Sequence, residues 1–302
     1  MSITTQSTAL RPAGDSTSVV RMLPGMLRPF ERADLRPVPS SWRVGPPDFV
    51  AIGCGRAGST WSWSSIEQHP NVVANRLGQK ELHYFLHFGW DGPNAEQRAV
   101  YREAFAAPHG SICGDGTFNY LTHPLAIQHL WSAAPQTKLL AILRNPIDRF
   151  ASSYDMFLRK RLRWLGLTGE RAHVQRICSL WDEAVTNCRL ADGFRSVLRR
   201  WPRERLLVLQ YEQCVRDPEH ELARTYRFLG LTDGFVPSEL ARPVNSERHE
   251  LASPDADARA RLAEMFQADV DALFAMFPEL DRSLWADFDH VESSARSRTV
   301  GA

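Results

Sequence analysis

Residues 48–60, DFVAIGCGRAGST, decide the fold, because an apolar run ends there in a series of glycines and hydroxyls. Residues 49–52 are typical of a short buried strand, and the glycines at 53, 55 and 58 permit a tight turn with positive φ values. A helix is predicted from Thr60 to about Gln68, since Pro70 prevents its continuation. The first amides of that helix would favour an anion, most naturally a phosphate.

The position of the positive charge separates this loop from the usual nucleotide loop. A nucleoside-triphosphate P-loop, GxxxxGK[ST], carries a lysine directly after its last glycine. Gly53 and Gly58 have that spacing, but Ser59 stands at the lysine position, and the charge lies at Arg56, inside the turn. The sequence therefore predicts a phosphate-binding loop that does not hold its ligand as ATP is held.

A second strand-to-helix junction lies in residues 138–154, KLLAILRNPIDRFASSY. Residues 139–143 form the continuous apolar run of a strand that is covered on both faces, and Pro146 suits the start of a helix. Arg144, at the end of this strand, and Ser152, about two helical turns later, can converge on one anion. The segment alone fits an ion pair between Arg144 and Asp148 equally well.

Two segments between these junctions carry further polar candidates. GQKELHYF, residues 78–85, follows a predicted strand at residues 72–73, where doubly wound sheets place ligand groups. Glu81 or His83 could act there as a general base, although a solvated turn fits the composition as well. After a helix predicted at 101–107, residues 112–120, ICGDGTFNY, are predicted as a strand in which Asp115 and Thr117 lie on a face that could be wet.

The composition indicates one α/β domain. We expect residues 1–45 to form a mobile or surface-lying arm, residues 46–290 to form the domain and residues 291–302 to fray. No apolar run has the length of a transmembrane helix, so a soluble protein is expected. The chain has 36 Lys and Arg against 35 Asp and Glu, so no overall positive charge favours binding to nucleic acid. Five cysteines without CxxC spacing fit reduced thiols in the cytoplasm, and no His/Cys cluster has the spacing of metal ligands.

Four motifs occur in the order and spacing of sulfotransferases that use 3′-phosphoadenosine 5′-phosphosulfate (PAPS): GCGRAGST, KELHYF, GDGTFNYL and RNPIDRFASSY. Over roughly residues 46–290 the chain resembles the branch with carbohydrate sulfotransferases and their bacterial relatives. The resemblance implies a three-layer, P-loop-like α/β fold, in which helices flank a central, mostly parallel sheet. It also implies metal-free transfer of a sulfuryl group from PAPS to a hydroxyl or amine of a carbohydrate, lipid or small natural product, which leaves PAP.

In this family two segments hold the nucleotide. The resemblance assigns the 5′-phosphosulfate to five residues of the first loop: Arg56, Ala57, Gly58, Ser59 and Thr60. It assigns the 3′-phosphate to Arg144 and Ser152. Residues 242–246, RPVNS, resemble the late cofactor loop of Golgi protein-tyrosine sulfotransferases. This likeness makes Arg242 and Asn245 candidate cofactor contacts, although an ordinary polar loop fits nearly as well.

The resemblance places activation of the acceptor at the second motif. Glu81 matches the carboxylate that deprotonates the acceptor in the carbohydrate branch, and Lys80 and His83 look like its supporting charges. Relatives often carry a lysine before the Thr or Ser of the third motif, where this chain has Gly116, so Thr117 is a substrate-binding candidate without that cation.

Arg56 replaces a lysine that many relatives carry, although arginine is found in bacterial members. Because a guanidinium keeps its proton, Arg56 is expected to act as an electrostatic clamp and not as a proton donor.

Two other functions stay open at this point. A P-loop kinase or NTPase would need a loop lysine and a magnesium-binding aspartate at a strand end, for which Glu212 is the nearest substitute. A catalytically inactive PAP-binding protein would bind the nucleotide without transfer. Loops such as 85–94 and 158–173 would line the acceptor pocket, but the sequence names neither the small-molecule or glycan acceptor nor the oligomeric state.

Overall fold

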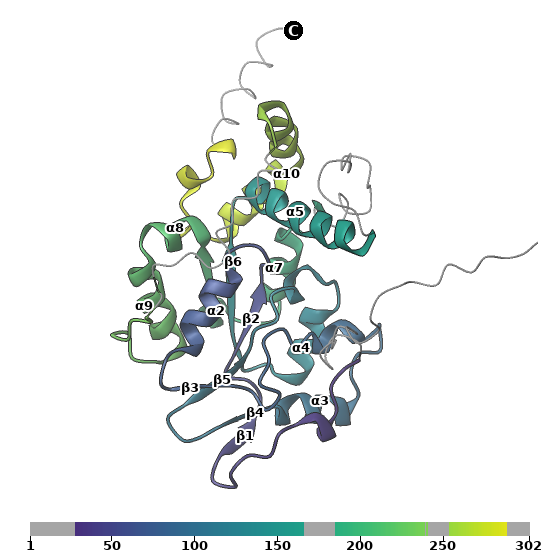
Figure 1. Ribbon diagram of the computed structural model, residues 1–302, viewed down its shortest axis with the longest axis vertical. Helices are drawn as coiled ribbons and strands as arrows, with labels where there is room; N and C mark the ends of the chain where they lie inside the picture. The colour runs from purple at the N-terminus through teal and green to yellow at the C-terminus, as the bar shows by residue number, and fades with distance from the viewer. Residues whose placement is uncertain (1–27, 166–184, 239, 241–253, 289–302) are drawn as a thin grey trace, which may run out of the picture.

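The computed structural model describes residues 28–165, 185–238, 240 and 254–288, and a central parallel sheet organises them (Figure 1). The sheet has five strands in the order β3-β5-β2-β6-β7. Each neighbouring pair of strands is parallel. The strands are β2 Phe49–Gly53, β3 Val72–Val73, β5 Ile112–Asp115, β6 Lys138–Leu143 and β7 Leu206–Gln210.

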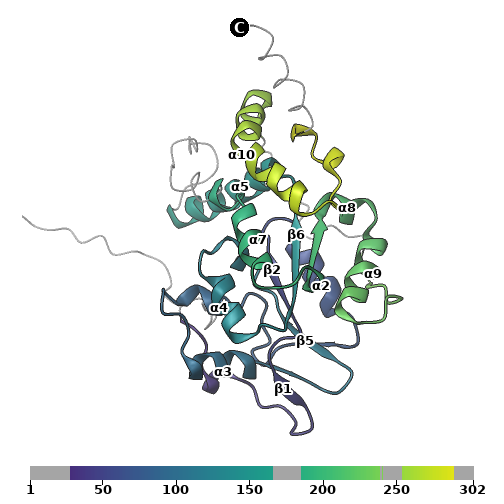
Figure 2. The same ribbon diagram turned by 180° about the vertical axis from the view of Figure 1, so that it is seen from behind.

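Helices cover both faces of this sheet and its carboxyl end. Helix α2 lies in front of the sheet in Figure 1, whereas α4 and α7 lie in front in the opposite view of Figure 2. Helices α5 and α10 lie at the end towards which the strands point. The predicted three-layer, P-loop-like α/β fold is therefore confirmed. The helices are α2 Ser59–Glu67, α3 Ala95–Glu103, α4 Ala126–Ala133, α5 Pro146–Leu165, α7 Ala191–Leu198, α8 Tyr211–Arg216, α9 Pro218–Leu229 and α10 Ala256–Met276.

Apolar runs form the middle of the sheet. Every residue of β2 is buried, and in β6 all residues after Lys138 are buried. Strands with helices on both faces need side chains that are apolar on both faces, which explains why these runs do not alternate with polar residues. The strands predicted at 49–52 and 139–143 therefore form as expected.

The order of the strands brings three loops to one place. The chain passes from β2 to β3 and β5 on one side of β2, and then crosses to β6 and β7 on the other side. At such a switch point, the loops after the central strands diverge and leave room for a ligand. The segments after β2, β5 and β6 begin at Cys54, Gly116 and Arg144, so three of the four sequence motifs meet there.

The helix predicted at residues 101–107 is wrong in its position. Helix α3 begins earlier, at a capping box in which the Asn94 side chain accepts from the Gln97 amide at 2.9 Å and the Gln97 side chain accepts from the Asn94 amide at 2.8 Å. The residues that follow α3 form strand β4, Phe105–Ala107. This strand pairs with β1, Arg43–Gly45, in an antiparallel sheet, so a distant partner overrides local helix propensity.

The segment before the first long strand lies against the domain. Phe30 is buried, and its ring centroid lies 4.4 Å from that of Tyr84 in the 3-10 helix η2, Tyr84–His87. Residues 28–45 thus pack on the body of the molecule, whereas residues 1–27 and the predicted tail 291–302 lie outside the described residues. Among the helices described here, none combines the length and the apolar character needed to cross a membrane.

Candidate active site

The loop after β2 turns sharply at two residues with left-handed backbone. Gly58 has φ +85°, and a Cβ atom there would lie 2.6 Å from the Tyr211 ring, so only glycine fits. The second left-handed residue is Arg56, with φ +65°, and not Gly53 or Gly55 as the sequence predicts. Non-glycine residues adopt this conformation at a cost in free energy, which is often found where a site must hold a fixed shape.

Hydrogen bonds to the backbone of Gly55 hold this loop in place. Arg149 of α5 is almost fully buried, and its Nε donates to the carbonyl of Gly55 at 2.9 Å. The amide of Gly55 donates to the carbonyl of Phe118 at 3.0 Å. No sequence motif singles out Arg149, and its one signal is its place a helical turn after the N-terminus of α5. Cys54 is also buried, and burial raises the pKa of its thiol to about 11, as in a packed residue.

Two arginines, each in a segment that follows a different strand, lie close together at this loop. Arg144 Nη1 donates to the carbonyl of Arg56 at 3.3 Å, and Arg56 Nε donates to Ser152 Oγ at 3.1 Å. The predicted alternative, an ion pair between Arg144 and Asp148, is wrong, because Asp148 pairs with Arg259 at 3.0 Å. The structure therefore brings Arg56, Arg144 and Ser152 together, with Ser152 bound to Arg56.

The electrostatics of this pair favour an anion. Burial, and then the neighbouring Arg144, lower the pKa of Arg56, and Asp155 opposes this effect. Two nearby cations are stabilised when an anion with more than one charge binds between them. The Arg144 guanidinium also lies over the Tyr211 ring at 4.8 Å, a cation–π contact that fixes its direction.

The remaining predicted loop residues lie at the start of α2. Ser59 is half-buried and Thr60 is exposed, so their hydroxyls and amides are accessible. Ala57 is fully buried, backbone included, so no part of it is open to solvent. The first amides of a helix have no partner within the helix and carry its positive dipole end, so this side of the loop also attracts negative charge.

Glu212 lies next to the backbone that follows Arg144. Its Oε1 accepts from the Asn145 amide at 2.9 Å and its Oε2 from Trp285 Nε1 at 3.0 Å. Glu212 therefore holds the backbone that follows Arg144. The alternative in which Glu212 serves a kinase as its magnesium ligand loses support, because both carboxylate oxygens already accept structural hydrogen bonds. Among the described residues, no group of three His, Cys, Asp or Glu side chains could hold a metal ion.

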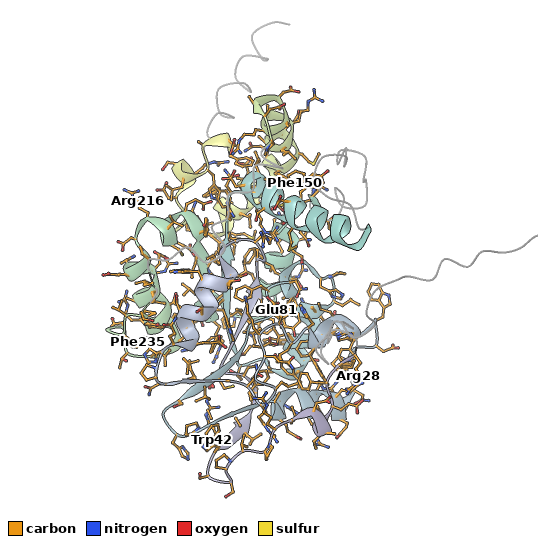
Figure 3. All side chains as sticks on the ribbon, viewed as in Figure 1. Arg28, Trp42, Glu81, Phe150, Arg216 and Phe235 are labelled. Carbon is orange, nitrogen blue, oxygen red and sulfur yellow. The ribbon has the colours of Figure 1, made fainter. Side chains whose placement is uncertain are left out.

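Glu81 lies near the middle of the molecule, below α5 (Figure 3). Its Oε2 accepts from the Phe118 amide at 3.2 Å, and its Oε1 lies 3.7 Å from Lys80 Nζ. Burial raises the pKa of Glu81 to about 7, although Lys80 and the Phe118 amide oppose the shift. A carboxylate with a pKa near 7 suits a general base, since it is basic and about half of it is ionised at neutral pH.

Burial limits what the His83 and Thr117 side chains can do. Burial lowers the pKa of His83, so its imidazole is mostly neutral at pH 7. Thr117 is fully buried, and its Oγ1 donates to Asp115 Oδ1 at 2.6 Å and accepts from the His83 amide at 3.2 Å. The predicted wet face of this segment is wrong, and a direct substrate contact by Thr117 is not available. Arg242 and Asn245 lie outside the described residues.

A glycine-rich loop that leads into a helix, and a pair of arginines beside it at the switch point of a parallel sheet, define a P-loop-like α/β protein that lacks the ATP-type lysine. Residues 94–235 match the model of the sulfotransferase family. The match covers just under half of the chain, and it confirms the resemblance to sulfotransferases that the motifs predict. This match includes Arg144 and Ser152 but begins after the first loop and Glu81.

Curated relatives agree with this assignment, and one solved structure shares the fold. Heparan sulfate glucosamine 3-O-sulfotransferase 6 of Homo sapiens is 29% identical over 191 residues, which are 61% of this chain and 52% of that protein. The 3-O-sulfotransferase 3A1 of Mus musculus is 28% identical over 189 residues, 61% of this chain and 46% of that protein. The chain therefore spans about half the length of these relatives. The crystal structure of a sulfotransferase from Alicyclobacillus acidocaldarius has the same fold, with a TM-score of 0.58 and 24% identity, over 80% of this chain and 100% of that one.

Proposed function

We propose that this chain is a sulfotransferase that moves a sulfuryl group from PAPS to a hydroxyl or amine of a carbohydrate acceptor. The observation that carries the proposal is the contact between the two arginine segments, with Arg144 Nη1 3.3 Å from the carbonyl of Arg56. A nucleotide with phosphates at both its 3′ and 5′ positions offers one anion to each guanidinium. The position of Glu81 beside the same loop adds the base that an acceptor needs.

The residues fit PAPS in their chemistry. Arg56 and the first amides of α2 would hold the 5′-phosphosulfate, and Arg144 the 3′-phosphate. When bound, PAPS supplies the sulfuryl group, whose sulfur gains a bond to the acceptor oxygen while its bond to the bridging phosphate oxygen breaks. Glu81 takes the proton of the acceptor hydroxyl and later releases it to water. Arg56 stabilises the negative charge that the phosphate of PAP keeps.

The direct test is transfer of labelled sulfate from PAPS to acceptors. We would incubate the protein with labelled PAPS and a panel of glucosamine-containing oligosaccharides, lipids and phenols, together with a fractionated extract of the source cells, and identify the labelled products. A labelled product that depends on active protein supports the proposal. Binding of PAP without transfer to any acceptor would instead indicate the inactive PAP-binding protein. The cytoplasmic location stays a prediction.

Replacing Arg144 with alanine should weaken binding of PAP far more than binding of adenosine 5′-phosphosulfate, which lacks the 3′-phosphate. Loss of a charged hydrogen bond costs about 1.5–3 kcal/mol, or about 10- to 150-fold in Kd. Isothermal titration calorimetry with both nucleotides measures the difference. Arg216, exposed at the edge of the molecule (Figure 3), supplies a matched control, since Arg216→Ala should change neither affinity. An equal loss for both nucleotides would contradict the 3′-phosphate assignment.

An exposed tryptophan supports a carbohydrate acceptor. Trp90 is 86% exposed, in the loop 85–94 that is expected to line the acceptor pocket. The turn that carries it is closed by a hydrogen bond from the Gly92 amide to the Gly89 carbonyl at 3.1 Å, and His129 Nε2 contacts the same carbonyl at 3.1 Å. A rigid turn holds the indole in water at little further entropic cost on binding, as a platform for a sugar ring requires.

Replacing Trp90 with alanine should raise KM for a glycan acceptor by about 10-fold, the loss typical of an aromatic anchor. The KM for PAPS and the melting temperature should not change, because the indole packs on so little of the protein. Val215, which is 63% exposed on α8, offers a control in Val215→Ala. An acceptor KM that stays at the wild-type value would exclude Trp90 from the acceptor site.

A further inference from the structure

The backbone of one residue joins the phosphate loop to the candidate base. Phe118 donates its amide to Glu81 Oε2 at 3.2 Å and accepts from the Gly55 amide at its carbonyl at 3.0 Å. Its ring also lies under the Lys80 ammonium, 4.8 Å from the centroid. A displacement of this backbone would therefore move Glu81 relative to the loop.

The Phe118 backbone is thus a bridge between the loop and Glu81. The residue before it, Thr117, is held in the core by a hydrogen bond. Thr117 Oγ1 donates to Asp115 Oδ1 at 2.6 Å. Asp115 is fully buried, and its Oδ2 accepts from Tyr101 at 3.0 Å and from Tyr120 at 3.2 Å. A buried carboxylate with three hydroxyl donors is held rigidly, and here the donors come from two segments, α3 for Tyr101 and the chain after β5 for Thr117 and Tyr120.

Thr117 also holds the backbone of the segment that carries Glu81. Its Oγ1 accepts from the amide of His83, whose φ is +55°, and Glu81 two residues earlier has φ +61°. Left-handed backbone is unfavourable at residues other than glycine, so the surroundings must hold it in place. The hydrogen bond from His83 to Thr117 supplies such a hold, next to the bond from Phe118 to Glu81.

We propose that Asp115 and Thr117 are positioning residues that set the distance between the phosphate loop and Glu81. They touch neither the nucleotide nor the acceptor, and act through the backbone of Phe118 and His83. The inference rests on the proposed function, since it concerns the same reaction. The charged and titratable groups around the bridge are Lys80 and His83 on the Glu81 segment and Tyr101 and Tyr120 around Asp115.

The test compares Thr117→Val, which keeps the shape but loses the hydroxyl, with Thr117→Ser, which keeps the hydroxyl. We expect kcat to fall about 10²-fold in the valine variant, because small displacements of reacting groups have effects of this size. The serine variant should stay within a few-fold of wild type. The Kd of PAP should change in neither variant, which separates positioning from a general loss of structure.

Two further variants establish the route through Thr117. Adding Asp115→Asn to Thr117→Val should lower kcat no further, since Asp115 acts through the hydroxyl that is already absent. Tyr101→Phe removes one of the donors that hold Asp115 but leaves its bond to Thr117, so it should lower the melting temperature and lower kcat by less than Thr117→Val does. If kcat of the double variant is clearly lower than kcat of Thr117→Val alone, Asp115 does not act through Thr117 and that part of the proposal is wrong.

A readout without catalysis separates this inference from the proposed function. Amide hydrogen exchange at His83 should be faster in Thr117→Val than in Thr117→Ser, whether or not the protein transfers sulfate. If this difference in exchange is present but the wild-type protein transfers no sulfate, the proposed function is wrong, and the conclusion that Thr117 holds the His83 backbone stands. Equal exchange in both variants, or a valine variant with wild-type kcat, would overturn the positioning role.

Discussion

Replacing Arg56 with alanine is expected to lower kcat for sulfuryl transfer by about 10² to 10³, the usual loss when one preorganised donor is removed from developing charge. The guanidinium is aimed by the bond from its Nε to Ser152 Oγ at 3.1 Å. The loop itself is held by other groups, because Arg149 binds the Gly55 carbonyl and Arg144 binds the Arg56 carbonyl. The alanine variant should therefore keep the loop and lose only the charge.

Initial rates at saturating PAPS and acceptor measure this effect, and Arg56→Lys is the matched control. Lysine keeps the positive charge but not the fork that binds both Ser152 and a phosphate oxygen, so its kcat should lie between those of wild type and alanine. A melting temperature near that of wild type would show that the loop is intact. An alanine variant with unchanged kcat would mean that Arg56 does not stabilise the transition state.

Local signals explain which parts of the fold could be predicted from the sequence. Helix α9 begins after Asp217, whose side chain accepts from the His220 amide at 3.1 Å, and ends at Gly230 with φ +84°. Both caps are visible in the sequence, because the residue types that fit them are few. The buried strands β2 and β6 are equally visible as apolar runs that end in loop residues.

Contacts between distant segments explain what could not be predicted. Strand β4 exists because residues 43–45 pair with it, and nothing in Phe-Ala-Ala itself indicates a strand. The pattern of residues 112–120 predicts a face on which Asp115 could contact water, yet Asp115 is fully buried among three hydroxyls. A polar residue near the end of a strand has the same pattern in both cases, and only the tertiary partners decide between them.

The candidate site shows the same division. Arg56, Arg144 and Glu81 were found because charged side chains follow predicted strands in recognisable motifs. Phe118 was missed as a contact because it acts through its backbone, which no pattern of side chains reveals. Tyr211 was missed as well, although its ring explains both the glycine at 58 and the direction of Arg144.

Replacing Glu81 with glutamine should lower kcat by about 10² to 10⁴, the range for a general base, and leave the Kd of PAP unchanged. The amide has nearly the shape of the carboxylate, and its oxygen can still accept from the Phe118 amide, so the bridge between loop and base should persist. Single-turnover rates with preformed protein–PAPS complex isolate the transfer step, and calorimetry with PAP supplies the control for binding.

The pH dependence of the wild-type rate gives a second, independent test of the same base. Burial raises the pKa of Glu81 to about 7, and only the ionised carboxylate accepts a proton. The rate should therefore fall by about tenfold for each unit of pH below 7 and level off above it. His83 would give a different profile, because burial lowers the pKa of its imidazole and a neutral ring is the active form. Its acidic limb would lie at a lower pH than that of Glu81. If Glu81→Gln keeps wild-type transfer and the limb lies at this lower pH, His83 is the base, and His83→Asn should then abolish transfer.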